Sequence, residues 1–76
     1  MAGGINMYSV HILNENGHGS YLSAKGKSTW KTKAIAIKHA KDIIAIKNKS
    51  HRFAGMIEAS VEDEHGETIT SFRSGL

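Results

Sequence analysis

The sequence predicts a small α+β domain of order ββαββ, in which a four-stranded antiparallel sheet carries one helix packed on one face. Three observations lead to this prediction. Two pairs of segments alternate apolar and polar residues, one pair before and one pair after a single stretch with helical periodicity. A turn signal joins the members of each pair, Asn16-Gly17 in the first and DEHG, residues 63–66, in the second. A chain of 76 residues has room for one such domain.

The first pair of strands is predicted over residues 7–14 and 20–30. The first segment, MYSVHILN, alternates as a strand with one buried face does. The second segment is less regular, and Gly26 is expected either to weaken it or to mark a bulge. Residues 1–6 are predicted to be a flexible leader, and residues 7–73 are predicted to form the single domain.

The helix is predicted over residues 33–47, because this stretch contains no Gly or Pro and Thr32 can supply the N-cap hydroxyl. The second pair of strands follows over residues 56–62 and 67–73. In the first of these strands, the alternation predicts that the odd-numbered apolar residues, beginning with Ile57, face the core.

The helix has a wider apolar arc than packing on one sheet requires. Ile35, His39 and Ile46 form a flank beside the central apolar stripe. A curved sheet that wraps further around the helix would cover this flank. The alternative is that these three residues form a protein interface, since exposed apolar patches usually serve binding. The partner would then be a second copy, giving a homodimer, or a larger host complex that the chain inhibits.

The charged residues divide along the chain. Residues 25–52 carry nine Lys or Arg and one acid, a local charge of +8, whereas residues 56–67 carry five acids and no base. A concentration of exposed cations favours an acidic partner, and nucleic acid binds such surfaces mainly by releasing counterions. The predicted nucleic-acid-binding residues are Lys25, Lys27, Lys31, Lys33, Lys38, Lys41, Lys47, Lys49 and Arg52.

Two aromatic residues accompany this basic stretch. Tyr21 precedes it and Trp30 lies within it. Trp30 is predicted to cover the open end of the core, ahead of the helix, and the alternative is that Trp30, together with Tyr21, stacks on exposed bases and so belongs to the nucleic-acid-binding residues. The lysines themselves have the alternative of forming an ordinary solvated surface.

Several function classes are not supported by any motif. The chain has no cysteine, no nucleophile elbow and no Gly-rich phosphate loop, so no catalytic residue is predicted. The five histidines include no pair at metal-ligand spacing, so neither a metal nor a cofactor is expected. No apolar run approaches the roughly 20 residues of a membrane span, and the start lacks a signal-peptide pattern. The prediction is a cytoplasmic, non-enzymatic binding module.

The segment that leads into the helix carries two resemblances. Trp30, Thr32, Lys33 and Ala36, with the later DEHG turn, resemble small bacterial and phage ββαββ domains that share an aromatic-x-Thr-Lys-x-x-Ala signature. The same segment is similar to the arm-binding N-terminal domains of phage integrases, which lay a small sheet in the major groove of DNA. In size and element order the chain also resembles small phage inhibitors of host defence, such as anti-CRISPR proteins. These resemblances imply a phage-type module that binds DNA or a host complex.

Overall fold

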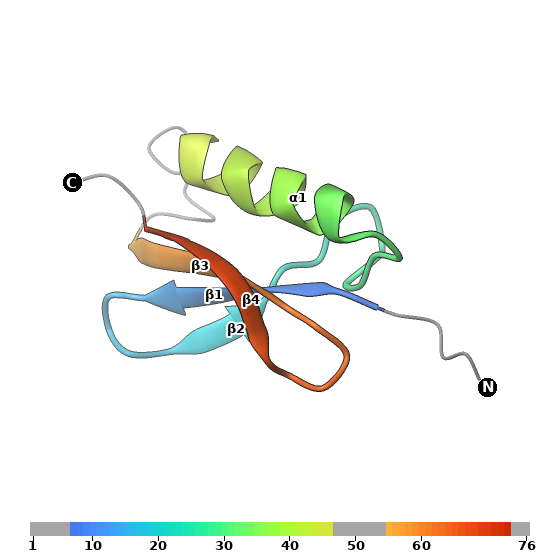
Figure 1. Cartoon of the computed structure of the whole chain (residues 1–76). Coiled ribbons are helices and arrows are strands. Elements are labelled where there is room, and N and C mark those ends of the chain that lie inside the picture. Colours follow the sequence, from blue (N-terminus) through green and yellow to red (C-terminus); the bar gives the residue numbers. More distant parts are fainter. Residues whose placement is uncertain (1–6, 47–54, 74–76) are drawn as a thin grey trace.

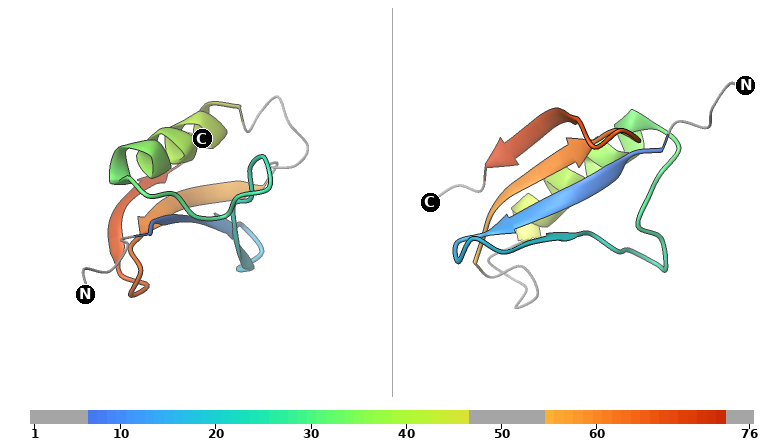
Figure 2. Two further views of the ribbon diagram at one scale, coloured as in Figure 1. Left: turned by 90° about the vertical axis from the view of Figure 1, so that its right-hand side faces the viewer. Right: turned by 90° about the horizontal axis from the view of Figure 1, so that it is seen from below.

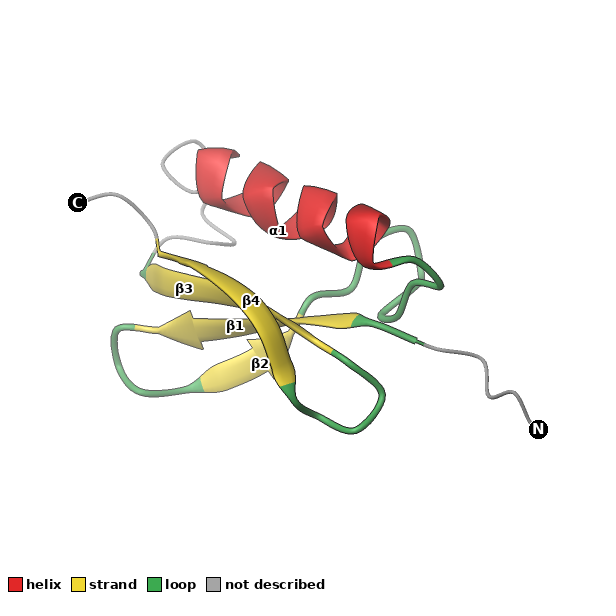
Figure 3. Ribbon diagram, viewed as in Figure 1, coloured by secondary structure: helices red, strands yellow, loops and turns green. Residues whose placement is uncertain are grey.

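The predicted α+β fold is confirmed by a computed structural model, which describes residues 7–46 and 55–73. One antiparallel sheet has the strand order β2-β1-β3-β4, and the helix lies across one of its faces (Figures 1 and 3). The elements are β1 (Ser9–Asn14), β2 (Gly19–Tyr21), α1 (Lys33–Ile46), β3 (Met56–Glu62) and β4 (Thr68–Arg73). Within these described ranges, no helix has both the length and the apolar character needed to cross a bilayer.

The core lies between α1 and the two central strands. Val10 pairs with Val61 and Ile12 pairs with Ala59, so these apolar side chains share the face that α1 covers. The helix packs mainly over β3, where small residues on its inner face allow a close approach. The buried apolar residues are Val10, Ile12, Leu22, Trp30, Ala36, Ala40, Ile43, Met56, Ala59 and Val61.

The start of α1 agrees with the predicted N-cap. The Thr32 hydroxyl accepts a hydrogen bond of 3.2 Å from the backbone N–H of Ile35. The Thr32 carbonyl accepts the N–H of Ala36, also at 3.2 Å, which is the first bond of the helical ladder. Thr32 therefore sets the residue at which the chain turns into α1, and with it the position of the lysines on either side.

The second predicted strand is interrupted. β2 ends at Tyr21, although the N–H of Leu22 still donates to the carbonyl of Val10 over 2.9 Å. Pairing with the start of β1 resumes only at Trp30, whose backbone exchanges two hydrogen bonds of 2.8 Å with Tyr8. Residues 23–29 thus leave the sheet and return to it, which removes most of the strand predicted over residues 20–30.

A tight turn lies at the tip of this excursion. Ala24 and Lys27 donate to each other's carbonyls over 2.8 and 3.0 Å. The two residues between them, Lys25 and Gly26, have positive φ angles of 53° and 78°. Two positive φ angles in a two-residue loop define a type I′ turn, and glycine adopts that conformation without a steric cost. Gly26 therefore marks a turn and not a bulge.

A bulge in β3 contradicts one predicted orientation. Leu13 pairs with Glu58 and Asn14 pairs with Met56, so Ile57 is an extra residue with no partner on β1. The bulge shifts the alternation, and the side chain that points into the core is Met56, which is fully buried, while Ile57 is 39% exposed. The prediction that Ile57 faces the core is therefore wrong.

Candidate nucleic-acid interface

Most of the described lysines and acids lie on different parts of the folded domain, although Asp42 lies beside Lys38 on α1 and Arg73 lies beside Glu58. The six described lysines are all exposed: three precede α1, and three lie on it, with Lys33 as its first residue. Glu58 and Glu62 alternate with the inward-facing residues of β3 and so point to the sheet face opposite α1, which we call the open face. Figure 2 (right) shows that no other described element covers this face. Three further acids lie in or beside the β3–β4 turn: Asp63, Glu64 and Glu67.

Four exposed lysines lie close together in the sequence, and we call them the loop lysines: Lys25, Lys27, Lys31 and Lys33. The first two belong to the type I′ turn, and the last two flank the N-cap of α1. None of the three ion pairs between described residues includes any of them. The first turn of α1 also contains no acidic residue, so the positive end of the helix dipole adds to the same potential.

The two lysines further along α1, Lys38 and Lys41, differ from the loop lysines because each has a partner. Lys38 Nζ lies 3.0 Å from Asp42 Oδ2 in an exposed i,i+4 ion pair, a type that contributes only about 0.3–0.5 kcal/mol. Lys41 Nζ lies 5.7 Å from the centre of the Phe72 ring, on the β4 side of the helix. The predicted basic surface is therefore divided between a loop and a helix, and its remaining members, Lys47, Lys49 and Arg52, lie outside the described residues.

Trp30 belongs to the core. Only 8% of its surface is exposed. The centres of the Trp30 and His39 rings lie 4.6 Å apart, and the ring planes meet at 30°. His39 thus covers part of the ring, and so little of Trp30 is exposed that no open ring face remains for a base. The structure therefore agrees with the prediction that Trp30 covers one end of the core, and the alternative of an exposed stacking role is wrong.

Tyr21 is exposed, but it lies on the open face among the acids. Its hydroxyl reaches across β1 and donates a hydrogen bond of 2.8 Å to Glu62 Oε1. Its ring meets His11 edge to face, with 5.2 Å between the ring centres. The Glu62 carboxylate raises the pKa of Tyr21, because it accepts the phenolic hydrogen bond and its charge opposes ionisation of the phenol. The hydroxyl of Tyr21 is thus bonded to an acid, although its side chain also lies beside Ser28 and Thr29, which lie between Lys27 and Lys31.

The raised pKa of Tyr21 leads to a prediction about pH. We expect Glu62→Gln to lower the pKa of Tyr21 towards its ordinary value of about 10. Since the folded-state pKa is the higher one, the hydrogen bond stabilises the fold below the ordinary pKa and stops doing so as the pH rises through the raised value. An NMR titration of the Tyr21 ring in both proteins measures the shift. An identical titration in the two proteins would show that the hydrogen bond is not formed in solution.

The helix flank is not covered by the sheet. Ile35 is 46% exposed and Ile46 is 43% exposed, so a curved sheet does not account for the wide apolar arc. His39, the third member of the flank, is half-buried against Trp30 and is committed to the packing of the domain. Only the two isoleucines therefore remain available as the protein interface that was predicted from all three residues.

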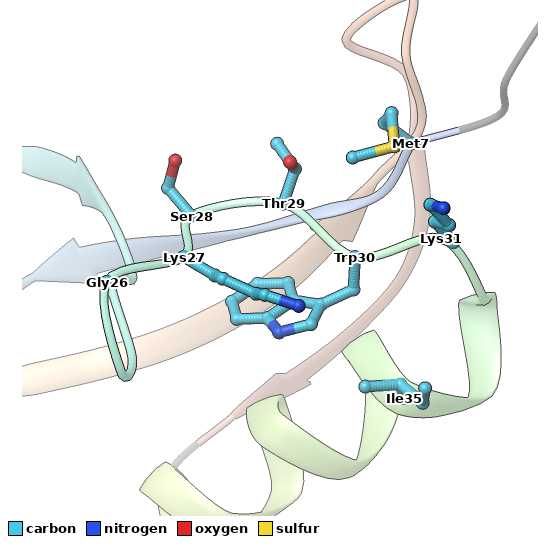
Figure 4. A pocket seen from close by; sticks show the side chains of 8 residues that line it. All are labelled: Met7, Gly26, Lys27, Ser28, Thr29, Trp30, Lys31 and Ile35. Carbon is cyan, nitrogen blue, oxygen red and sulfur yellow. The ribbon is translucent and has the colours of Figure 1, made fainter.

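An open pocket of about 550 Å³ lies between the excursion and the start of α1. Figure 4 shows Lys27 extending along the indole of Trp30 and Ile35 facing it from the helix, while Ser28 and Thr29 point away. The residues that line this pocket are Met7, Gly26, Lys27, Ser28, Thr29, Trp30, Lys31 and Ile35. No local sequence signal predicted it, because its walls come from the start of the first strand, the excursion and the helix.

Comparison with known proteins gives no assignment. No family model matches the chain, and no significant match was found among curated proteins or solved structures. Among the described residues, no group of three or more His, Asp or Glu side chains can hold a metal ion. The class of protein is therefore defined by the fold and the surface alone: a small α+β domain with a basic loop beside its helix and an acidic open face.

Proposed function

We propose that this protein is a non-enzymatic module that binds nucleic acid electrostatically through the loop lysines. The observation that carries the proposal is the exposure of four lysines within nine residues, none of them in an ion pair between described residues. Each lysine that contacts a phosphate releases a condensed counterion, which is the main source of affinity for such surfaces. The α1 lysines extend the surface along the helix.

The distribution of charge orients the bound nucleic acid. Glu62 and the acids of the β3–β4 turn repel phosphates, whereas Glu58 lies 3.8 Å from Arg73, so contact is expected on the side of the loop lysines and α1. The described cations on that side are all lysines, which act as point charges and lack the planar fork with which arginine reads guanine edges. Binding is therefore expected to depend weakly on base sequence.

The salt dependence of binding tests this proposal. We expect fluorescence anisotropy to show binding of labelled nucleic acid at low salt and a steep loss of affinity as salt is raised. If the loop lysines contact four phosphates of duplex DNA, the plot of log K against log salt has a slope of roughly −3 to −4. Duplex DNA, single-stranded DNA and RNA are compared in parallel. Absence of binding to all three at low salt would overturn the proposal.

A protein interaction is the second candidate function, and the exposure of Ile46 favours it. Ile46 lies three helical turns from Ile35 on the same flank, so the two can contact one partner. The partner expected on this reading is a second copy or a host protein with a matching apolar groove. β4 is also an edge strand of the sheet, although a register shift opposite Glu62 makes its edge irregular.

Ile46→Lys tests the second candidate without disturbing the loop lysines. If the flank joins two copies, the variant is expected to sediment as a monomer at concentrations where the natural chain sediments as a dimer. Its free energy of unfolding is expected to stay within about 0.5 kcal/mol of the original, because Ile46 is not in the core. A natural chain that is monomeric at every concentration would exclude the homodimer.

A further inference from the structure

The pocket beside the loop lysines combines two kinds of lining. Met7, Trp30 and Ile35 contribute apolar walls, whereas Lys27 and Lys31 contribute cations. An inorganic anion needs no apolar wall, and an apolar ligand needs no cation. The volume of about 550 Å³ lies within the range of roughly 300–1,000 Å³ that small organic ligands occupy. The lining therefore suits a ligand that is both aromatic and negatively charged.

The apolar side chains that line this pocket are not fully buried by the fold. Ile35 is 46% exposed and Met7 is only partly buried, although both line the pocket, Ile35 on the side of the indole and Met7 across the chain from it (Figure 4). Because Trp30 has no open ring face, a flat group on this side of the pocket would meet the indole at its edge and lie against Ile35. Covering these side chains would remove apolar surface from water, which favours binding.

We propose that this pocket receives one unpaired nucleotide, with its base against Ile35 and the edge of Trp30. Its phosphates are held by Lys27 and Lys31. This inference rests on the proposed binding of nucleic acid by the loop lysines, and it adds a preference that charge alone does not produce. Bases inside a duplex are paired and stacked, and unstacking one costs a few kcal/mol. A single strand offers its bases freely, so it is expected to bind more tightly than a duplex of equal length.

Matched substitutions on one helix test the role of the pocket. Ile35→Ala removes an apolar wall, and Ile46→Ala removes the same side chain, at similar exposure, three turns away from the pocket. We expect Ile35→Ala to weaken binding of single-stranded DNA by roughly fivefold. The affinity of the Ile35→Ala variant for duplex DNA and the salt slope of that binding are expected to stay unchanged. Ile46→Ala is expected to change neither single-strand nor duplex affinity. Equal effects of the two substitutions on single-strand binding would overturn the inference.

Trp30 provides a second readout, because it is the only tryptophan of the chain and lines the pocket. Single-stranded DNA is expected to change its fluorescence on binding, whereas duplex DNA is expected to bind by the anisotropy assay without that change. The inference would be overturned if single-stranded DNA bound without changing the emission of Trp30, or if duplex DNA changed that emission equally. Either result would leave the proposed function in place. Loss of binding to every nucleic acid would instead overturn the proposed function.

Adenosine monophosphate distinguishes between a nucleotide within a strand and a free nucleotide as the ligand of the pocket. A strand has further phosphates for Lys25 and Lys33, so it is expected to bind at least tenfold more tightly than the free nucleotide. If adenosine monophosphate and the single strand both changed the fluorescence of Trp30 and bound with equal affinity, the pocket would be a nucleotide site for free nucleotides. No change with either ligand would overturn the inference.

Discussion

Replacing Trp30 with alanine is expected to lower the free energy of unfolding by about 3–5 kcal/mol. Trp30 is 8% exposed, packs on His39 and fills the end of the core where the excursion returns to β1. A domain of 76 residues has a total stability near the low end of the usual range of about 5–15 kcal/mol. The variant is therefore expected to be largely unfolded at room temperature, as judged by circular dichroism during urea titration.

Two controls separate the packing of Trp30 from its backbone role. Trp30→Phe keeps an aromatic ring against His39 and is expected to cost about 1–2 kcal/mol. His39→Ala removes the other, half-buried ring and is expected to cost less than Trp30→Ala. A loss below about 1 kcal/mol for Trp30→Ala would contradict the buried position of Trp30. It would also restore this residue as a candidate for stacking on bases.

Reversing the charge of three loop lysines is expected to weaken nucleic-acid binding by on the order of a hundredfold or more at moderate salt. The triple variant Lys27→Glu, Lys31→Glu, Lys33→Glu would remove three of the proposed phosphate contacts and add three repulsive charges. Lys25 is left unchanged because its φ of 53° makes any substitution there a test of the turn as well. All three altered side chains are exposed, so circular dichroism and urea unfolding are expected to match the original protein.

The lysines of α1 supply the control for this experiment. Lys38→Glu with Lys41→Glu is expected to weaken binding less than tenfold, because Lys38 is already paired with Asp42 and Lys41 lies over Phe72. An equal loss per residue in both variants would show that net charge, and not the position of the loop lysines, controls affinity. Unchanged affinity in the triple variant would remove the loop lysines from the interface.

Features that depend on neighbouring residues were predicted correctly from the sequence. The alternation of residues 7–14 and the Asn16-Gly17 turn act over a few residues, and so does the hydroxyl of Thr32 at the start of α1. Their effects do not depend on what the segment packs against. The lysine-rich stretch was also evident, because net charge needs no fold to define it.

Features that depend on register or on distant segments were not predicted. The exposure of Ile57 follows from a bulge that appears only when β3 pairs with β1. The bond from Tyr21 to Glu62 joins residues 41 positions apart, and it places a predicted stacking residue among acids. The excursion at residues 23–29 contains a local turn, but its return to the sheet depends on the pairing of Trp30 with Tyr8.

By itself, the amino-acid sequence determined the class of fold, the order of the elements and the presence of a basic segment, because periodicity, turn residues and charge are local properties. Only the tertiary structure decided which lysines remain without an ion-pair partner among the described residues, where Trp30 lies, and that Met7, Ile35 and the excursion surround one pocket. The physical reason is that burial and proximity arise when segments far apart in the chain pack together, and no single segment contains that information.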